Sequence, residues 1–323
     1  MNLGPMRVPH GITPVTATDR AVRYVHEAFL YRGRDDFLAG AVPFVTSAVS
    51  AGAPVLVAVD ADKIAALRGA LGDAARHIEF VVMTEAGRNP GRVISLWRHF
   101  VGSSGGQPCA GLGEPVWSTR SADELVECQH HEQLLNHAFP ATTAFHLRCP
   151  YDIDTLGAAV VDEAIRSHPH LAGSDTNSAY VAVDGASLLR SSLDRPPAGA
   201  LVLPLDVEAL RAARHAVGDQ ATAAGFSAAR RDDIVLVASE LATNALHHGA
   251  EPSTLGSWSS PAALVVEVRD AGRLDDPLVG RRRPEPGSSG GRGLWLVHEL
   301  ADLVQVRSDD TGTTVRASFR LSR

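Results

Sequence analysis

Hydrophobic positions in the first part of the chain follow two alternating patterns. Residues 54–59 and 78–83 are short apolar runs rich in valine, and a similar run covers residues 143–150. Such runs are typical of buried strands. Residues 37–45 and 61–71 instead predict helices. Because alternating strands and helices indicate a parallel sheet covered by helices, we predict an N-terminal α/β domain of the Rossmann-like or RecA-like type.

The pattern breaks at residues 193–200, which contain two prolines and a glycine among small residues. This composition is typical of a linker. Beyond it, residues 207–224 predict a helix and residues 263–268 predict a strand. We therefore predict a two-domain α/β protein, with a first domain over residues 1–192 and an α+β domain over residues 201–323.

One predicted helix of the second domain carries polar residues beside its apolar face. Glu240, Asn244 and His247 are spaced by four and three residues, so they project from one side of the helix. A carboxylate can accept a proton or hold a water, and an amide oxygen suits Mg²⁺ beside phosphates. A solvated helix face has the same pattern, so these residues alone do not define a site.

Two later segments have chemistry that suits a nucleotide. Asp270 ends the predicted strand and precedes Gly272, so its carboxylate can accept a hydrogen bond from an adenine amine while the backbone approaches the ring. A simple turn has the same composition. Residues 287–294 form a glycine-rich segment before an apolar helix, where free N–H groups favour a phosphate.

The charged residues limit how a phosphate can be bound. Lys63 is the only lysine, so phosphate charge must be met by Mg²⁺, backbone amides or arginines. Arg292 and the run 281–283 are the candidate arginines, although a solvated loop also explains the run. The net charge of −7 argues against broad binding to nucleic acid or to anionic membranes.

Cysteine usage and hydropathy predict the compartment. Cys109, Cys128 and Cys149 are far apart and form no CxxC motif, which indicates reduced thiols. The first ten residues lack an apolar signal segment, and no window is long and apolar enough to span a bilayer. The content of arginine, alanine, glycine and proline is typical of a GC-rich bacterial genome. We expect a cytoplasmic bacterial protein without a membrane anchor.

The polar signals of the second domain, in this order, resemble the ATP-binding domain shared by gyrase, histidine kinases and the related heat-shock chaperone, over residues 203–319. Within that superfamily, segments 239–245 and 293–297 resemble the anti-sigma factor serine kinases of bacterial partner switching, especially the actinobacterial branch. The resemblance implies an open sandwich of a mixed sheet and helices. It also implies that ATP and Mg²⁺ bind between the first-box helix and a mobile lid.

The resemblance assigns roles to individual residues. Asn244 would ligate Mg²⁺, Asp270 would bind the adenine amine, and Glu240 would act as general base toward a partner's Ser or Thr hydroxyl. The other implied cofactor-binding residues are His247, Gly272, Gly291, Arg292, Gly293, Leu294 and Thr313. Arg273 follows Gly272, where the family often has another glycine.

The first domain resembles the MEDS sensory domain over residues 18–180. The matching segments are His26, 31–33, 36–38, 52–55, 113–117 and 149–152. The resemblance implies a derived α/β domain that senses small organic molecules, and the absence of a phosphate loop at residues 33–37 agrees with a sensor rather than a second ATPase. The candidate pocket residues are His26, Tyr31, Glu114, Trp117, Glu132 and Asn136. Cys128, His131 and Glu132 also lie about one helical turn apart, which suggests either a metal site or a packed helix.

Three functions are compatible with these features. The first is a transcription regulator that senses a ligand, phosphorylates an anti-sigma antagonist on Ser or Thr with ATP, and sequesters a sigma factor; homodimers are expected from the family. The second is an ATP-gated binding protein without kinase activity, which Arg273 favours. The third is a histidine kinase output, for which His215 is the candidate phosphoacceptor, although its segment more closely resembles the first helix of the ATP domain.

Overall fold

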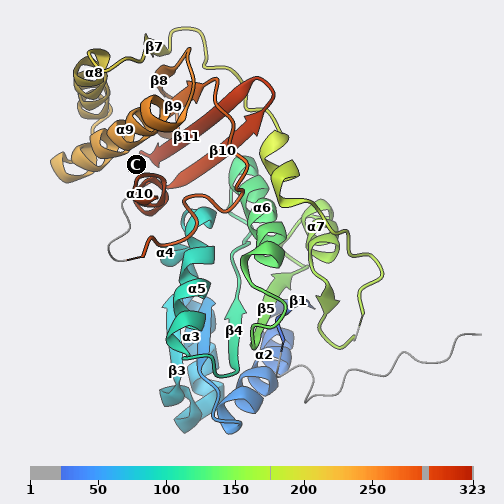
Figure 1. Ribbon diagram of the computed structural model, residues 1–323. Coiled ribbons are helices and arrows are strands. Elements are labelled where there is room, and N and C mark those ends of the chain that lie inside the picture. The colour runs from blue at the N-terminus through green and yellow to red at the C-terminus, as the bar shows by residue number, and fades with distance from the viewer. Residues whose placement is uncertain (1–22, 175, 286–290, 322–323) are drawn as a thin grey trace, which may run out of the picture.

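Short apolar runs at the start of the chain form a parallel sheet (Figure 1). The computed structural model describes residues 23–174, 176–285 and 291–321. Within these residues the sheet order is β3-β2-β4-β5-β1-β6, and every adjacent pair is parallel. The strands are β1 (Val25–Tyr31), β2 (Val55–Val59), β3 (Ile78–Val82), β4 (Cys109–Gly113), β5 (Phe145–Asp152) and β6 (His170–Leu171). Every residue of β2 is buried, as expected for a strand covered on both faces.

Helices cover both faces of this sheet. The helices are α2 (Gly33–Ser50), α3 (Ala61–Leu71), α4 (Met83–Ala86), α5 (Val93–Ser103), α6 (Ala122–Ala138) and α7 (Ala158–Ser167), with 3₁₀ turns η1 (Gly72–His77), η2 (Pro90–Arg92) and η3 (Gly185–Arg190). Side chains of α2 and α3 form one apolar core with the sheet, and side chains of α5, α6 and α7 form another. The Ser121 hydroxyl and the Glu124 carboxylate accept each other's backbone N–H in a capping box that begins α6.

The second domain is an antiparallel sheet with helices on one face. Its elements are β7 (Leu201–Pro204), α8 (Ala209–Ala223), α9 (Ala228–His248), β8 (Thr254–Ser259), β9 (Ala263–Asp270), α10 (Arg292–Leu300), β10 (Leu303–Asp309) and β11 (Gly312–Arg320). The sheet order is β10-β11-β9-β8-β7. Every adjacent pair is antiparallel, in contrast to the mixed sheet expected. Short turns make the pairs β8–β9 and β10–β11 antiparallel, whereas helices lie between the strands of the other two pairs.

The predicted elements correspond closely to the observed ones. The helix predicted over residues 61–71 coincides with α3, whereas α2 extends well beyond the predicted residues 37–45. His215 lies on the exposed side of α8, and the other side of α8 packs into the core of the second domain. Residues 191–200 contain no helix or strand. The two-domain α/β fold class is thus confirmed, and α8 belongs to the second domain rather than to a separate dimerisation helix.

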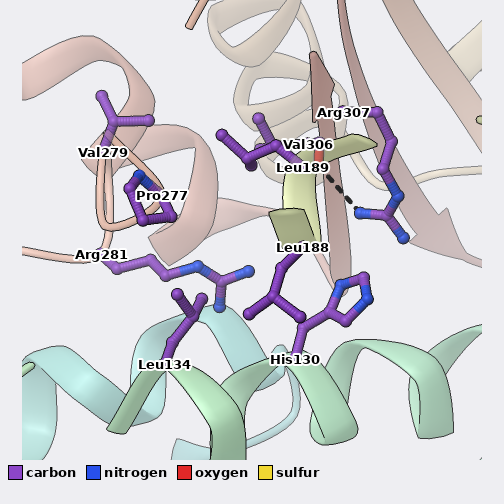
Figure 2. A pocket seen from close by; sticks show the side chains of 9 residues that line it. All are labelled: His130, Leu134, Leu188, Leu189, Pro277, Val279, Arg281, Val306 and Arg307. Atoms are coloured by element: carbon purple, nitrogen blue, oxygen red, sulfur yellow. Dashed lines mark hydrogen bonds between the residues drawn. The ribbon is translucent and has the colours of Figure 1, made fainter. Parts of the chain in front are cut away.

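The two domains share an extensive junction (Figure 1). Leu189 of η3 belongs to the core of the second domain, and Leu278 belongs to the core of the first. A small pocket at the junction is lined by His130 and Leu134 of α6 on one side and by Arg281 and Arg307 on the other (Figure 2). Because each core takes a side chain from the other domain, the junction is part of the fold.

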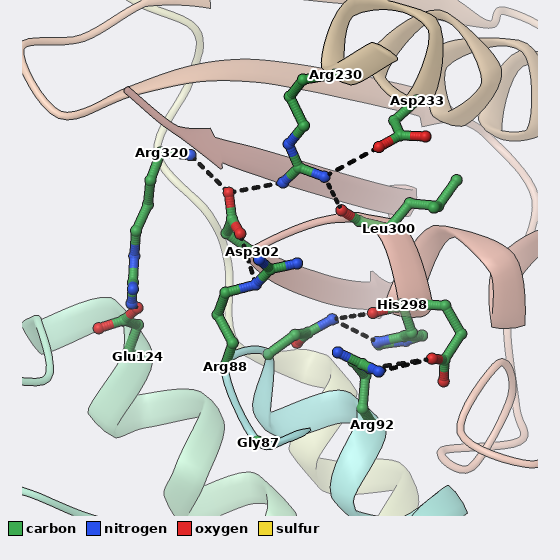
Figure 3. A network of polar contacts seen from close by, with 12 residues as sticks. Gly87, Arg88, Arg92, Glu124, Arg230, Asp233, His298, Leu300, Asp302 and Arg320 are labelled. Carbon is green, nitrogen blue, oxygen red and sulfur yellow. Dashed lines mark hydrogen bonds and ion pairs between the residues drawn. The ribbon is translucent and has the colours of Figure 1, made fainter. Parts of the chain in front are cut away.

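Polar contacts extend the junction around α10 (Figure 3). The Asn89 amide donates to the His298 carbonyl at 2.8 Å, and Arg92 pairs with Glu299 at 3.0 Å. Arg88 pairs with Asp302 at 2.7 Å. The first domain therefore holds α10 and the start of β10. None of the helices in the described ranges has the length and apolar character needed to cross a bilayer.

Candidate functional site

A cavity in the second domain lies between α9, β9 and the start of α10. It has a volume of about 310 Å³, within the range of small-molecule sites. Of the predicted site residues, those that line it are Asn244, Asp270, Gly272, Gly291, Gly293, Leu294 and Thr313. Four segments far apart in the sequence therefore meet at one cavity.

Asp270 forms one wall of this cavity at the end of β9. Its Oδ1 accepts a hydrogen bond from the Gly272 backbone N–H at 2.8 Å, and burial raises the pKa of its carboxyl. A Cβ atom at Gly249 would lie 2.6 Å from this Oδ1. The glycine at this position thus lets the backbone after α9 approach the carboxylate closely. Thr313 closes this side, because its hydroxyl donates to the Gly272 carbonyl at 2.9 Å.

The start of α10 contacts the polar side of α9. A Cβ atom at Gly293 would lie 2.6 Å from Glu240 Oε2 and 3.1 Å from Asn244 Oδ1. Gly291 precedes the helix with a φ of 81°, in the left-handed region that favours glycine. The carboxylate and the carboxamide therefore lie beside a helix start, where backbone N–H groups lack partners within the helix.

Three predicted residues do not line the cavity: Glu240, His247 and Arg292. Glu240 lies beside Gly293, while His247 is exposed, and the next residue, His248, lines the cavity instead. The helix turns by about 100° per residue, so the side that bears residues 241, 245 and 248 faces the cavity.

The arginines of the run 281–283 contact residues outside the cavity. Arg281 is buried against Glu127 of the first domain, and the Arg283 guanidinium lies 6.0 Å from the centre of the Trp295 ring. Arg273, which is not part of the run, does line the cavity and also pairs with Asp310 at 2.6 Å on the surface. The predicted phosphate role of the run is thus not supported by its contacts. Residues 287–290 of the glycine-rich segment lie outside the described residues.

The cavity also has an apolar wall that the polar motifs did not reveal. Its apolar side chains are Leu241, Ala245, Val268, Leu274, Val279 and Val315. Leu241 and Ala245 are buried on the apolar face of α9, so the hydrophobic pattern explains their burial but does not indicate their contact with the cavity. An apolar wall opposite a carboxylate suits a flat, polar-edged ring such as adenine.

The sensory candidates of the first domain fall into two separate groups. In one group, the Tyr31 hydroxyl donates to Glu114 Oε1 at 2.6 Å, and Lys63 pairs with Glu114 Oε2 at 2.8 Å. Burial raises the pKa of Glu114 to about 7 and outweighs the opposing effect of Lys63. These residues lie at or just beyond the carboxyl ends of β1, β2 and β4, the usual edge for ligands in such sheets.

The other group joins His26, Glu132 and Asn136 on the opposite side of the sheet. His26 Nε2 lies 3.1 Å from Glu132 Oε2, and its Nδ1 lies 2.9 Å from Asn136 Oδ1. Trp117 belongs to neither group, because its ring stacks on the guanidinium of Arg120. The six candidates therefore do not line a single pocket.

The helical spacing of Cys128, His131 and Glu132 does not produce a metal site of those three residues. The Cys128 thiol donates to the Pro115 carbonyl, and burial raises its pKa to about 12. The metal-compatible group found among the described residues includes Glu132 but neither Cys128 nor His131.

Comparisons with known proteins identify both domains. Residues 25–169 match the MEDS family (MEthanogen/methylotroph, DcmR Sensory domain), and residues 203–319 match the histidine kinase-like ATPase domain family. Among solved structures, the RsbU and RsbW domains of Rv1364c from Mycobacterium tuberculosis share 23% identity with the chain. That similarity has a TM-score of 0.30 and covers 40% of this chain and 34% of that one, so this chain spans about a third of that structure's length.

No curated protein matches the sequence. The family matches agree with the two cores, since one lies in the parallel-sheet domain and the other in the antiparallel-sheet domain. A sensory domain joined to a kinase-like ATPase domain supports a role as a signalling regulator, and the ATPase domain implies ATP binding, usually with Mg²⁺. The chain thus combines a domain that matches the MEDS sensory family with a following domain that matches the histidine kinase-like ATPase family.

Proposed function

We propose that the protein is an ATP-dependent serine/threonine kinase of a partner-switching system. Its ATPase domain would phosphorylate an antagonist protein and, in the unswitched state, bind a sigma factor. The observation that supports this proposal is the convergence of Asn244, Asp270 and Gly293 on one cavity, with Glu240 beside Gly293. A carboxylate next to a helix start that can bind phosphate is the arrangement that general-base phosphoryl transfer requires.

The residues around the cavity fit ATP with Mg²⁺. Asp270 would accept the adenine amine, the apolar wall would hold the ring, and the N–H groups at the start of α10 would bind phosphate oxygens. The Asn244 amide oxygen would hold Mg²⁺. Bound ATP would supply the transferable phosphoryl group. Glu240 lies outside the cavity wall, so an incoming Ser or Thr hydroxyl could reach it from the protein surface.

Contacts around α10 offer a path from the sensory domain to this site. The helix begins at the proposed phosphate-binding residues, and its other end is held by Asn89 and Arg92 of the first domain. Its His298 is buried at the junction, and burial holds the pKa of that ring well below its usual range, which favours the neutral form. A ligand that moves η2 would therefore move the helix that binds phosphate.

The test uses the full-length protein, γ-labelled ATP and candidate antagonist proteins. Glu240→Gln is expected to lower phosphoryl transfer about 100-fold or more, while ATP affinity changes less than twofold. Asp270→Asn is expected to weaken ATP binding about 10- to 100-fold, because it removes an acceptor for the adenine amine. Glu208→Gln, an exposed carboxylate at the start of α8, is the matched control and should change neither. Unchanged transfer in Glu240→Gln would remove Glu240 from the mechanism.

An ATP-gated binding protein without kinase activity is the second candidate. It is favoured by Arg273, which replaces the expected glycine and is held on the surface by Asp310. The same assay separates the two candidates. Tight ATP binding by the wild type with no transfer to any antagonist, together with ATP-dependent partner binding, supports this second function.

A further inference from the structure

Four buried side chains with metal-binding atoms meet inside the sensory domain. They are His26 on β1, Glu132 on α6, Cys149 on β5 and His168 directly after α7. One ligand atom from each lies within 4.8 Å of the other three. Their exposed fractions are 1%, 2%, 2% and 0%. Because these four polar side chains have no access to water, their ligand atoms must either bond to one another or bind a further group.

The surrounding hydrogen bonds fix the orientation of both imidazole rings. His168 Nδ1 lies 2.7 Å from the Ala164 carbonyl, which can only accept, so this nitrogen carries the proton. The Asn136 amide nitrogen donates to the Ser167 carbonyl at 2.8 Å, so its oxygen faces His26 and accepts from Nδ1 at 2.9 Å. In the neutral rings, both Nε2 atoms therefore present lone pairs to the centre of the cluster.

Both lone pairs face the Glu132 carboxylate, and the weak donor beside them is the Cys149 thiol, 3.5 Å from His26 Nε2. Glu132 Oε2 lies 3.1 Å from His26 Nε2 and 3.3 Å from His168 Nε2. In the described part of the chain, His168 Nε2 and Glu132 Oε1 have no hydrogen-bond partner. Protonating both rings would place two positive charges with ring centres 4.1 Å apart beside one carboxylate. A cation between the three side chains would bind the lone pairs of both Nε2 atoms and one carboxylate oxygen at once.

We propose that His26, Glu132, Cys149 and His168 bind one divalent ion of the Zn²⁺ type. Zinc–ligand bonds of about 2.0–2.1 Å to nitrogen or oxygen and about 2.3 Å to sulfur give tetrahedral edges of roughly 3.3 Å and 3.6 Å. Three of the six separations agree with these edges, since Cys149 Sγ lies 3.5 Å from His26 Nε2 and the nitrogen–oxygen distances are 3.1 Å and 3.3 Å. The other three are within 4.8 Å, so small shifts of the side chains would complete the tetrahedron. A thiolate and a carboxylate would also neutralise the two charges of the ion.

The donor set selects the kind of metal. A thiolate and two imidazoles favour Zn²⁺ and similar ions over Mg²⁺, which prefers oxygen ligands. Four protein ligands complete a tetrahedron, so the site has the closed form of structural or sensory ions rather than the open form of catalytic ones. Asn136 and the Ala164 carbonyl orient the two imidazoles in the manner usual around bound zinc.

The ion would join four elements and reach the domain junction through α6. Glu132 lies in the second half of this helix, while Glu124 and Glu127 in the first half pair with Arg320 and Arg307 of the ATPase domain. Metal binding would thus fix the helix that connects the sheet of the sensory domain with the ATPase domain. The proposal does not depend on kinase activity.

Metal content of the purified full-length protein tests the site. After chelation and reloading with Zn²⁺ alone, the wild type is expected to hold one ion per chain. Cys149→Ser and His168→Gln are expected to retain less than a tenth of that amount. Cys109→Ser is the matched control, because Cys109 is also buried but lies outside the cluster, and it should keep the ion. A wild type that binds no Zn²⁺ at micromolar concentration, or a folded Cys149→Ser that still holds the ion, would overturn the proposal.

Cobalt substitution gives a result even where a variant does not fold. The wild type loaded with Co²⁺ is expected to show the visible bands of tetrahedral cobalt and a thiolate-to-metal charge-transfer band in the near ultraviolet. Loss of the charge-transfer band in Cys149→Ser, but not in Cys109→Ser, would assign the sulfur ligand. A wild-type spectrum typical of six oxygen or nitrogen ligands, without the thiolate band, would refute the site.

Discussion

Replacing Glu127 by Gln is expected to destabilise the protein strongly through the domain junction. Glu127 Oε1 lies 2.6 Å from Arg307 Nη2, and Oε2 lies 3.4 Å from Arg281 Nη2. The exposed fractions of the three residues are 0%, 6% and 4%. Within the described residues, Arg281 Nη1 and Arg307 Nε have no hydrogen-bond partner. The glutamate is therefore the main counter-charge for two buried guanidinium groups.

The magnitude follows from burial of the charges. Two unit charges about 4 Å apart attract by about 4 kcal/mol at an effective dielectric constant of about 20. Removing one partner from a buried ion pair costs about 3–5 kcal/mol, because the other charge stays buried without compensation. Gln keeps one acceptor oxygen and nearly the same shape. We therefore expect a loss of about 3 kcal/mol in the free energy of unfolding for Glu127→Gln.

Urea denaturation monitored by tryptophan fluorescence measures this loss. Trp97 reports on the first domain, and Trp258 reports on the second. Because Glu127 connects the domains, both signals are expected to move to lower urea. Glu299→Gln is the matched control: its partner Arg92 lies 3.0 Å away across the same junction, but both side chains are about a quarter exposed. That variant should cost about 1 kcal/mol or less.

The double variant separates the ion pair from other effects of the substitution. Glu127→Gln combined with Arg307→Met removes both charges, so its cost is expected to be clearly smaller than the sum of the two single costs. If Glu127→Gln costs no more than Glu299→Gln, or if the two single costs simply add, the buried charges do not stabilise the junction and the reasoning fails.

Two further predictions concern pH dependence and close packing. Burial raises the pKa of Glu114 from 4.5 to about 7, so the native protein keeps a proton that the unfolded chain has lost in this range. The contribution of this proton to stability is full below the unfolded pKa and is lost as pH rises through about 7, by about 3 kcal/mol in total. Urea titrations on both sides of this range should therefore show that the free energy of unfolding falls with pH in the wild type but not in Glu114→Gln. A Cβ atom at Gly91 would lie 2.1 Å from His298 Nδ1, so Gly91→Ala is expected to lower stability by about 1–3 kcal/mol. Gly102→Ala is the control, because the added Cβ would meet no neighbouring atom within 4 Å, and its stability in thermal unfolding should be unchanged or slightly raised. An equal loss of stability in both variants would contradict the close contact at Gly91.

Local sequence patterns predicted most elements and several residues that line the cavity of the second domain. A buried apolar run identified β2, helical spacing identified α3 to the residue, and a proline-rich segment marked the region between the domains. Asn244, Asp270 and Gly293 could be identified because each polar or glycine residue lies at the end of a predicted element or on one side of a predicted helix. These properties depend on residues close together in sequence, which explains why the sequence alone sufficed.

Other features depend on which distant elements pack together. Periodicity placed His247 on the polar side of α9, but only the rotation of α9 against β9 brings His248 to the cavity instead. No local signal paired Arg281 with Glu127, which lies in the other domain.

The sequence by itself determined the two folds, their order and the residue types that line the cavity of the second domain, because short-range spacing and backbone preference set these. Only the tertiary structure decided that Cys149 and His168 meet His26 and Glu132 inside the sensory domain. The physical reason is that sheet register and helix packing join residues more than a hundred positions apart, and these depend on the whole core rather than on any local segment.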